Sequence, residues 1–498
     1  MEKSRSLSPW KIASASAILI WALLMGMLVK KTYFSSLSHP VGLRVAGQTG
    51  IQAGESWMGI YLQDRKVGYS VSRWEKEDLD WHMTERTVME LMVMGQPQSV
   101  QISTHCLLDP SLLMKSFRFH LSAGEVEFLA EGETRGKGRE LVVRLSGIGE
   151  KGKREMVIPV REVPLLSPNL RFLLKNRTLK EGQRFTFPFF DPATLQVEEL
   201  RMEVEGRERL RTGKEQVEAF KVRQSFKGLT ISTWVSQEGE VLREESPLGF
   251  TLVKEEKETA ILKGRGGGKA EDLIALAAVD SPVPIPDPQS IRILRIHLGD
   301  LAREGLDLEG GRQRVRGEIL EIRREVLDFP PSKLPIREPS LAAYLQATPF
   351  IQSDHPELKR MAGSILQGER DSLTAAKMLA AWVFERIEKR PTLSIPSALE
   401  VLQSRVGDCN EHTILYVGLA RSVGLPAKVA SGLVYVKGKF YYHAWPEVFV
   451  GRWVAIDPTL NQFPADATHL RLIEGGLERQ AELVRLMGKV SLQILGFQ

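Results

Sequence analysis

Residues 407–435 read GDCNEHTILYVGLARSVGLPAKVASGLVY, and residues 441–459 read YYHAWPEVFVGRWVAIDPT. From Asp408 to Gly424 the residues are apolar nearly all round a helix, so we predict a buried helix that Pro426 prevents from continuing. Alternating apolar and polar residues, interrupted by glycine-containing turns, then predict three short strands: 427–436, 440–450 and 453–457. This order predicts an α+β domain in which the buried helix packs on an antiparallel sheet.

Cys409 falls at the first turn of this predicted helix, directly after Gly407 and Asp408. The unpaired N–H groups and the dipole at a helix N-terminus favour negative charge, so we expect this position to lower the pKa of the thiol. The same N–H groups can stabilise an oxyanion on an acyl carbon that the sulfur attacks. The helix therefore predicts that Cys409 is a nucleophile.

A base and an acid follow on the predicted strands. Strand alternation puts His443 on one face together with Trp445 and Glu447, and Asp457 closes the third strand. A short turn between neighbouring antiparallel strands brings the carboxylate of Asp457 beside the imidazole of His443, where it would orient the ring and stabilise the imidazolium. We therefore predict a catalytic triad of Cys409, His443 and Asp457. In it, His443 is charged in the resting ion pair and later donates its proton to a leaving amine.

These residues resemble the transglutaminase-like superfamily of papain-type cysteine enzymes. The resemblance covers about residues 350–470 and rests on four motifs in order: a cysteine at a helix start after Gly-x, then G-L-P-A, H-A-W-x-E-V and W-x-x-x-D-P-T. It implies a papain-type fold and a triad of Cys409, His443 and Asp457 that acts through a thioester. It also implies an acyltransferase, or a cysteine protease or amidase, with a peptide or protein substrate.

Two other interpretations use the same residues. His412, one turn after Cys409, is an alternative base, but it lacks an evident acid partner. A cysteine, a histidine and an aspartate can also bind a metal, although three widely spaced single ligands are a weak signal of a metal site. We therefore predict neither a metal nor a cofactor. Trp445 and Trp453 are expected to be packing residues, with Trp445 on the strand face of His443.

The first 40 residues predict a membrane anchor. A basic start is followed by an apolar run at residues 12–29, which as a helix would be about 27 Å long, close to the thickness of a bilayer's hydrocarbon core. The run ends at Lys30-Lys31 without a small-residue cleavage site, which favours an uncleaved signal anchor over a cleaved signal peptide. We expect a single-pass protein of the inner or cell membrane whose bulk is periplasmic or extracytoplasmic.

The rest of the chain divides by composition. Residues 41–262 alternate as strands of a long antiparallel sheet, either one large curved sheet or two packed layers, with short helical segments near 167–176 and 213–218. Three parts follow: a Gly/Pro-rich linker at 263–289 that forms an extended spacer, a strand-rich connecting subdomain at 290–340, and a transglutaminase-like catalytic domain at 341–498. The mostly-β region looks like the accessory domains of membrane-anchored or exported bacterial members of the superfamily.

Composition excludes several classes of protein. The 498 residues include 67 basic and 62 acidic side chains, with a net charge of +5 and no basic stripe, so we predict no nucleic-acid binding. The two cysteines, Cys106 and Cys409, exclude a disulfide framework and a Cys-rich metal site. We expect both to be free thiols because they lie in different predicted domains.

Two functions remain, from different classes. The first is a membrane-anchored cysteine enzyme whose thioester is resolved by water or by a second amine. The second is a non-catalytic binding or scaffolding module at the cell envelope, in which the β region engages a protein partner. The presence of all three triad residues favours the enzyme.

Overall fold

The computed structural model describes the chain in these ranges: residues 52–124, 126–147, 154–175, 179–212, 215–262, 272–299, 303, 305–393 and 395–498. The predicted anchor at residues 1–40 and the first part of the predicted linker, 263–271, lie outside these ranges. Within the ranges, no helix is both long enough and apolar enough to cross a membrane.

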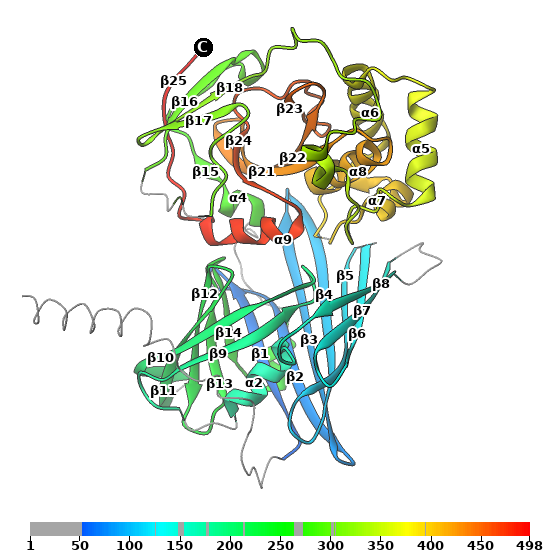
Figure 1. Cartoon of the computed structure of the whole chain (residues 1–498). Helices are drawn as coiled ribbons and strands as arrows, with labels where there is room; N and C mark the ends of the chain where they lie inside the picture. The colour runs from blue at the N-terminus through cyan, green and yellow to red at the C-terminus, as the bar shows by residue number, and fades with distance from the viewer. Residues whose placement is uncertain are drawn as a thin grey trace, which may run out of the picture.

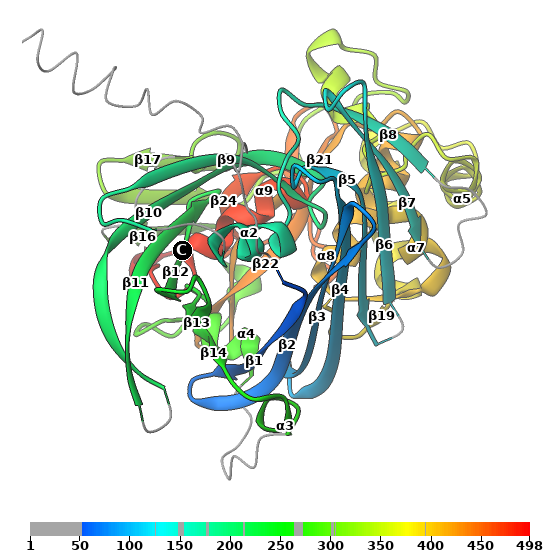
Figure 2. The same ribbon diagram turned by 90° about the horizontal axis from the view of Figure 1, so that it is seen from below.

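The β-rich half of the chain is one strongly curved antiparallel sheet (Figures 1 and 2). Its first run of strands is β1 Gly54–Leu62, β2 Arg65–Glu77, β3 Asp80–Val93, β4 Gln96–Leu108, β5 Met114–Ala123, β6 Val126–Arg135, β7 Glu140–Gly147 and β8 Arg154–Pro159. Its second run is β9 Arg184–Asp191, β10 Gln196–Thr212, β11 Glu215–Phe226, β12 Leu229–Ser236, β13 Val241–Glu245 and β14 Phe250–Lys254. β1 pairs with β14, so the two runs form a single sheet with β8 and β9 at its edges. The predicted large, mostly-β region is confirmed.

The helix α2, Ser167–Lys175, connects the two runs and lies inside the curve of the sheet (Figure 2). Its Phe172 packs against Trp81 of β3, with ring centroids 5.2 Å apart. The helix predicted near 167–176 is therefore confirmed, whereas the helical segment predicted near 213–218 is wrong for the described residues, which form strand β11 from Glu215 onward. There, Val217 pairs with Leu210 in the β10–β11 hairpin. The side chains of this segment pack against partners on the neighbouring strand, which stabilises a strand rather than a helix. A short helix, α3 Lys257–Ala260, follows β14.

The C-terminal half has the predicted α+β arrangement, with helices against an antiparallel sheet (Figure 1). The sheet consists of β15 Val279–Asp280, β21 Ala427–Val436, β22 Lys439–Phe449, β23 Trp453–Ala455 and β24 Leu470–Glu474. The helices are α5 Pro356–Leu366, α6 Ser372–Arg386, α7 Ala398–Ser404 and α8 Cys409–Ser422. α8 is buried from Glu411 to Ala420 and lies between the other three helices and strands β21 and β22.

The second part of the predicted linker belongs to this half and is not an extended spacer. Residues 273–277 form helix α4, capped by Asp272, and Val279 of β15 pairs with Phe440 of β22. Ile285 is buried in the core beside the sheet, and its N–H donates to the hydroxyl of Tyr435 at 2.9 Å. The segment is held against the sheet because the apolar side chain of Ile285, between the prolines, is removed from water in the core.

The predicted strand-rich subdomain also differs in its boundaries. β16 Ile293–His297, β17 Gln313–Arg316 and β18 Ile319–Arg323 form a sheet that is completed by β25 Gln493–Phe497 from the end of the chain. The sheet order is β17-β18-β16-β25. The short elements that complete the half are η2 Pro288–Ser290, η3 Pro339–Leu345, β19 Glu388–Lys389, β20 Val406–Gly407, α9 Leu477–Gln480 and η4 Ala481–Leu486.

The curved sheet supports the C-terminal half from below in the view of Figure 1. Phe128 of β6 packs against Phe350, with ring centroids 6.4 Å apart, and Ile395 is buried in the same cluster. Gln98 of β4 donates to the carbonyl of Pro391 at 3.3 Å. The curved sheet therefore contacts the segment that leads into α7 and, after it, to Cys409.

Gly432 of β21 provides a test of this packing. It pairs with His443 of β22, and a Cβ at this position would lie 1.9 Å from the carbonyl oxygen of Leu470. We expect Gly432→Ala to lower the free energy of unfolding by on the order of 2–3 kcal/mol, because backbone must move to relieve the overlap. Gly363→Ala on α5, where a Cβ meets no atom within 4 Å, is the control and should be neutral or stabilising. Urea unfolding of the two variants and the wild type measures the difference, and equal stability of the variants would contradict the close approach of β24 to β21.

Candidate active site

Cys409 is the first residue of α8, as predicted, and the helix start is capped on both sides of it. The carboxylate of Asp408 accepts hydrogen bonds from the N–H groups of Asn410, at 2.9 Å, and of Glu411, while the N–H of Asp408 donates to the carboxylate of Glu411 at 2.8 Å. A Cβ on Gly407 would lie 2.1 Å from the Cβ of Glu411, so only glycine fits before this capping box. The N–H of Cys409 itself has no hydrogen-bond partner among the described residues.

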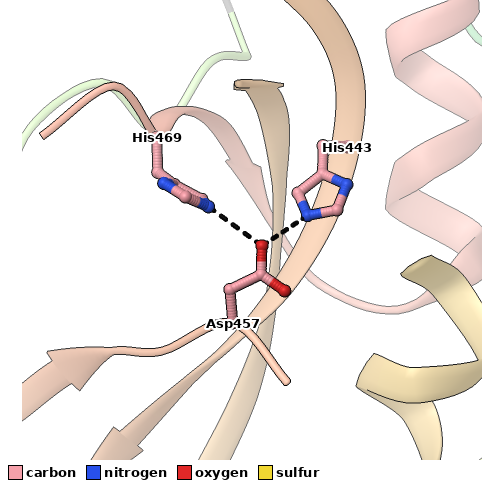
Figure 3. Close-up of side chains that lie close together, drawn as sticks. All are labelled: His443, Asp457 and His469. Atoms are coloured by element: carbon pink, nitrogen blue, oxygen red, sulfur yellow. Dashed lines mark hydrogen bonds and ion pairs between the residues drawn. The ribbon is translucent and has the colours of Figure 1, made fainter. Parts of the chain in front are cut away.

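His443 and Asp457 lie together, as predicted, with His443 Nε2 2.7 Å from Asp457 Oδ2 (Figure 3). The Asp457 carboxylate is fully buried, and its other oxygen accepts the N–H groups of Thr459 at 2.7 Å and Leu460 at 3.0 Å. Burial alone would raise the pKa of Asp457. The charges and hydrogen bonds of His443 and His469 outweigh burial and hold this pKa well below its ordinary value. Asp457 is therefore ionised.

The thiol of Cys409 lies against the strand that carries His443. α8 packs on β22, and the backbone of Ala444, directly after His443, acts to lower the pKa of the thiol. Because Nε2 of His443 faces Asp457, Nδ1 is the ring nitrogen left to exchange a proton with sulfur. The structure thus joins His443 to Asp457 by a hydrogen bond and packs α8, which begins at Cys409, against the strand that carries His443.

The prediction that the helix N-terminus lowers the pKa of Cys409 is wrong for the resting protein. Burial raises the pKa of the thiol, and the negative charges of Asp408, Glu411 and Asp457 raise it further, whereas the backbone of Ala444 lowers it. The capping box places two carboxylates at the helix end whose dipole was expected to favour the thiolate. The resting nucleophile is therefore a thiol, which has to lose its proton before it attacks.

His412, the alternative base, is turned into the helix packing. It is fully buried, its Nδ1 lies 2.6 Å from the carbonyl oxygen of Asp408, and burial lowers its pKa. Nε2 of His412 has no hydrogen-bond partner among the described residues, so no acid orients it. His443 is the better base because Asp457 holds it.

Trp445 is a packing residue, as predicted. Its side chain is fully buried, and its ring stacks near that of His443, with centroids 6.2 Å apart. It also packs edge-on against His469, with centroids 5.1 Å apart. Trp445 therefore fixes the position of both imidazoles. Trp453, the second predicted packing residue, contacts Tyr344 with ring centroids 4.8 Å apart.

His469 and Asp466 are two site residues that the sequence did not reveal. Nε2 of His469 lies 3.0 Å from Asp457 Oδ2, the same oxygen that binds His443 (Figure 3). Its Nδ1 lies 3.2 Å from Asp466 Oδ1. Both residues come from the irregular segment between β23 and β24, in ADATHL at residues 465–470, where no periodic pattern marks them. The one available signal is a histidine three residues after an aspartate, directly before an apolar strand.

The side chains of His443, Asp457 and His469 could each offer one metal-ligand atom, and these atoms lie within 4.8 Å of one another. A metal ligand needs a free lone pair on the imidazole. Both ring nitrogens of His469 face carboxylate oxygens and therefore carry protons. The donor set fits a hydrogen-bonded cluster and does not fit a metal ion.

A buried ionic cluster supports the strand that carries His443. Arg471 of β24 donates to both carboxylate oxygens of Glu447 at 3.1 and 3.0 Å, and Lys428 of β21 lies 3.1 Å from the same carboxylate. Burial would raise the pKa of Glu447, but Arg471 and Lys428 hold it below its ordinary value. These ion pairs join the three central strands two residues beyond Trp445.

Comparison with known proteins agrees with this site. Residues 359–458 match the family model of the transglutaminase-like superfamily, and this range contains all three predicted triad residues. The chain therefore contains a transglutaminase-like domain, and the match supports a cysteine enzyme. No curated protein sequence matches the chain.

Two solved structures are similar to parts of the chain. One is a candidate cysteine protease from Cytophaga hutchinsonii, with 14% identity, 41% of this chain and 81% of that chain covered, and a TM-score of 0.28. The other is a candidate protease from Parabacteroides distasonis, with 9% identity, 78% of this chain and 69% of that chain covered, and a TM-score of 0.19. The assignment of the domain rests on the family model and not on these two structures.

The pH dependence of unfolding tests the buried carboxylate of Asp466. The hydrogen bonds and charges of His469 and Thr468 outweigh burial and lower its pKa to about 2. A depressed pKa stabilises the fold above the unfolded-state value of about 4, and this stability is lost as the pH falls toward 2. We expect the free energy of unfolding of the wild type to exceed that of Asp466→Asn by about 2 kcal/mol or more near pH 6. The excess should shrink between pH 5 and pH 3, as measured by urea unfolding.

The control for this prediction is Asp328→Asn, because the Asp328 side chain is 74% exposed and pairs with Arg452 at the surface. Its unfolding curve should follow that of the wild type. A gap between Asp466→Asn and wild type that stays constant from pH 6 to pH 3 would show that Asp466 contributes nothing as an anion.

Proposed function

We propose that the chain is a cysteine acyl-transfer enzyme that attacks an amide bond of a peptide or protein substrate and forms a thioester on Cys409. The observation that carries the proposal is the buried, ionised Asp457 bound at 2.7 Å to His443, on the strand whose next residue, Ala444, contacts the thiol. Each residue then has a role: Cys409 as nucleophile, His443 as acid and base, and Asp457 as the group that orients the imidazole.

The first half of the reaction makes the thioester. Nδ1 of His443 takes the thiol proton, and the sulfur of Cys409 forms a bond to the carbonyl carbon of the amide. The resulting oxyanion needs donors, and the unpaired N–H of Cys409 at the start of α8 is one. His443 then returns the proton to the amide nitrogen, the C–N bond breaks, and an amine leaves.

The second half regenerates the thiol. Water or a second amine attacks the thioester carbon and gives its proton to His443, the C–S bond breaks, and the thiolate takes the proton back. With water the product is a carboxylate, and with an amine it is a new amide. Both outcomes use the same three residues.

The apolar run at residues 12–29 supports the further proposal that this enzyme is anchored in a membrane with its folded part outside the cytoplasm. The described residues would then meet substrates of the cell envelope. Release of the chain from membranes by alkaline carbonate would contradict the anchor.

Alkylation by iodoacetamide tests the activated thiol without knowledge of the substrate. We expect His443→Ala to slow the alkylation of Cys409 at pH 7 by about 10²-fold relative to the wild type, because the base that accepts the thiol proton is lost. Cys106→Ser is the control and should change nothing, since Cys106 is buried and burial raises its pKa to about 12. Mass spectrometry of the labelled peptide gives the rate at each cysteine. Equal alkylation rates of Cys409 in the wild type and in His443→Ala would instead favour a non-catalytic binding module.

The products distinguish hydrolysis from transfer. The purified chain is incubated with an envelope extract and a labelled primary amine, with Cys409→Ser in parallel. We expect either new protein N-termini or incorporated amine, and we expect Cys409→Ser to give neither, because a hydroxyl in this site lacks the nucleophilicity of sulfur. Equal products from both proteins would exclude Cys409 as the nucleophile.

A further inference from the structure

We propose that His469 is a positioning residue that acts on His443 through Asp457: held as a permanent cation between two carboxylates, it sets the pH range in which Cys409 reacts. This inference rests on the proposed function. It assigns a role to a buried histidine outside the predicted triad.

The hydrogen bonds around the two carboxylates show which groups carry protons. Both oxygens of Asp466 accept hydrogen bonds: Oδ1 from the N–H and the hydroxyl of Thr468, at 2.8 and 2.6 Å, and Oδ2 from the amide of Gln462 at 2.9 Å. Oδ1 of Asp457 accepts two backbone N–H groups. Donors surround both carboxylates, so each is an anion.

His469 lies between these two anions and is fully buried. A neutral imidazole has one N–H, so one of its two nitrogens would turn a lone pair toward a carboxylate oxygen at hydrogen-bond distance. That arrangement is repulsive, and no solvent reaches the ring to relieve it. The geometry therefore requires a doubly protonated His469. In agreement, burial lowers the pKa of His469, but Asp457 and Asp466 together raise it above its ordinary value.

The cation shares an oxygen with the base of the triad. Nε2 of His443 and Nε2 of His469 both face Asp457 Oδ2, and their rings are 5.9 Å apart. When His443 takes the thiol proton, two imidazolium ions face one carboxylate oxygen. The repulsion makes His443 a weaker base and a stronger acid, by on the order of one to two pH units at an effective dielectric constant of about 20.

Other charged groups act on the same cluster from the elements packed against it. From α8 and its cap they are Cys409, Asp408, Glu411 and His412; from β19, Lys389, whose charge acts on Asp457. Among the described residues, the guanidinium of Arg312 also approaches, donating to the carbonyl of Ala465 at 2.7 Å. None of these bonds Asp457 directly, so His469 is the cation with the strongest effect on the pair formed by Asp457 and His443.

The chemical consequence is that His443, after it has acted as a base, becomes a better acid. After the thioester forms, His443 has to give its proton to a poor leaving group, the amide nitrogen. An imidazolium that is stabilised by Asp457 alone would be a weak acid. The charge of His469 makes the His443 imidazolium a stronger acid, and it also reduces the fraction of Cys409 that is a thiolate at rest.

The pH profile of Cys409 alkylation by iodoacetamide tests the proposal in the full chain. The variant His469→Gln keeps an N–H donor for Asp457 but removes the charge. We expect the midpoint of the acidic limb, which reports deprotonation of the His443 imidazolium, to move upward by about one pH unit or more. His120→Gln, on the exposed part of β5, is the control and should leave the midpoint unchanged.

A second variant provides a test that does not depend on whether His469→Gln folds. Asp466→Asn removes the anion that holds the second proton on His469, so it should move the midpoint in the same direction by a smaller amount. A midpoint that stays at the wild-type value in both variants, or moves down, would overturn the role of His469. If His469→Gln does not fold, as judged by circular dichroism, the shift in Asp466→Asn decides.

The outcomes separate this inference from the proposed function. Equal alkylation rates of Cys409 in the wild type and in His443→Ala defeat the proposed function itself. A reactive wild-type Cys409 with unchanged midpoints in the folded variants leaves the proposed function intact and defeats only the role of His469. A lower rate at every pH with the same midpoint would mean that His469 is structural.

Discussion

The carboxylate of Asp457 carries a negative charge inside the protein, where an unpaired ion would be very unfavourable. Four hydrogen bonds meet this charge: two from imidazoles on one oxygen and two from backbone N–H groups on the other. The backbone donors hold the turn after β23, and the imidazoles tie it to β22 and to the start of β24. The geometry of the site therefore depends on satisfying one buried ion.

The rest of the C-terminal half keeps these donors in place. Gly432 allows β24 to approach β21, which brings His469 within reach of Asp457. The buried pair of Arg471 and Glu447 joins β24 to β22 below the site. On the other side, the capping box of α8 fixes the thiol but also adds negative charge next to it, so the helix start orients Cys409 more than it activates it.

The sequence alone was sufficient to predict those elements whose hydrophobic periodicity and turn residues indicate the same structure. The helix from Cys409, the strands after Pro426 and the neighbouring positions of His443 and Asp457 follow from alternation and turn residues. Features that depend on contacts between distant segments could not be predicted. Examples are the burial of Ile285 and the hydrogen bond between His469 and Asp457. The raised pKa of the Cys409 thiol could not be predicted either, because it results from burial and from nearby charges that are brought together only in the folded chain.

The sheet that contains β25 has a consequence for how the C-terminal half can be cut out of the chain. β16, β17 and β18 lie before the helices and β25 is the last strand of the chain, yet all four form one sheet. β15, earlier still, is an edge strand of the sheet that carries His443. A fragment that starts at residue 341 would lack β15–β18 and leave the edges of β22 and β25 that they pair with unpaired. It would also expose Phe440 and Leu470, which in the whole chain share one buried cluster with Leu294 and Ile322. By strand pairing, the C-terminal half therefore begins at β15 and includes the prolines that composition alone assigns to a spacer.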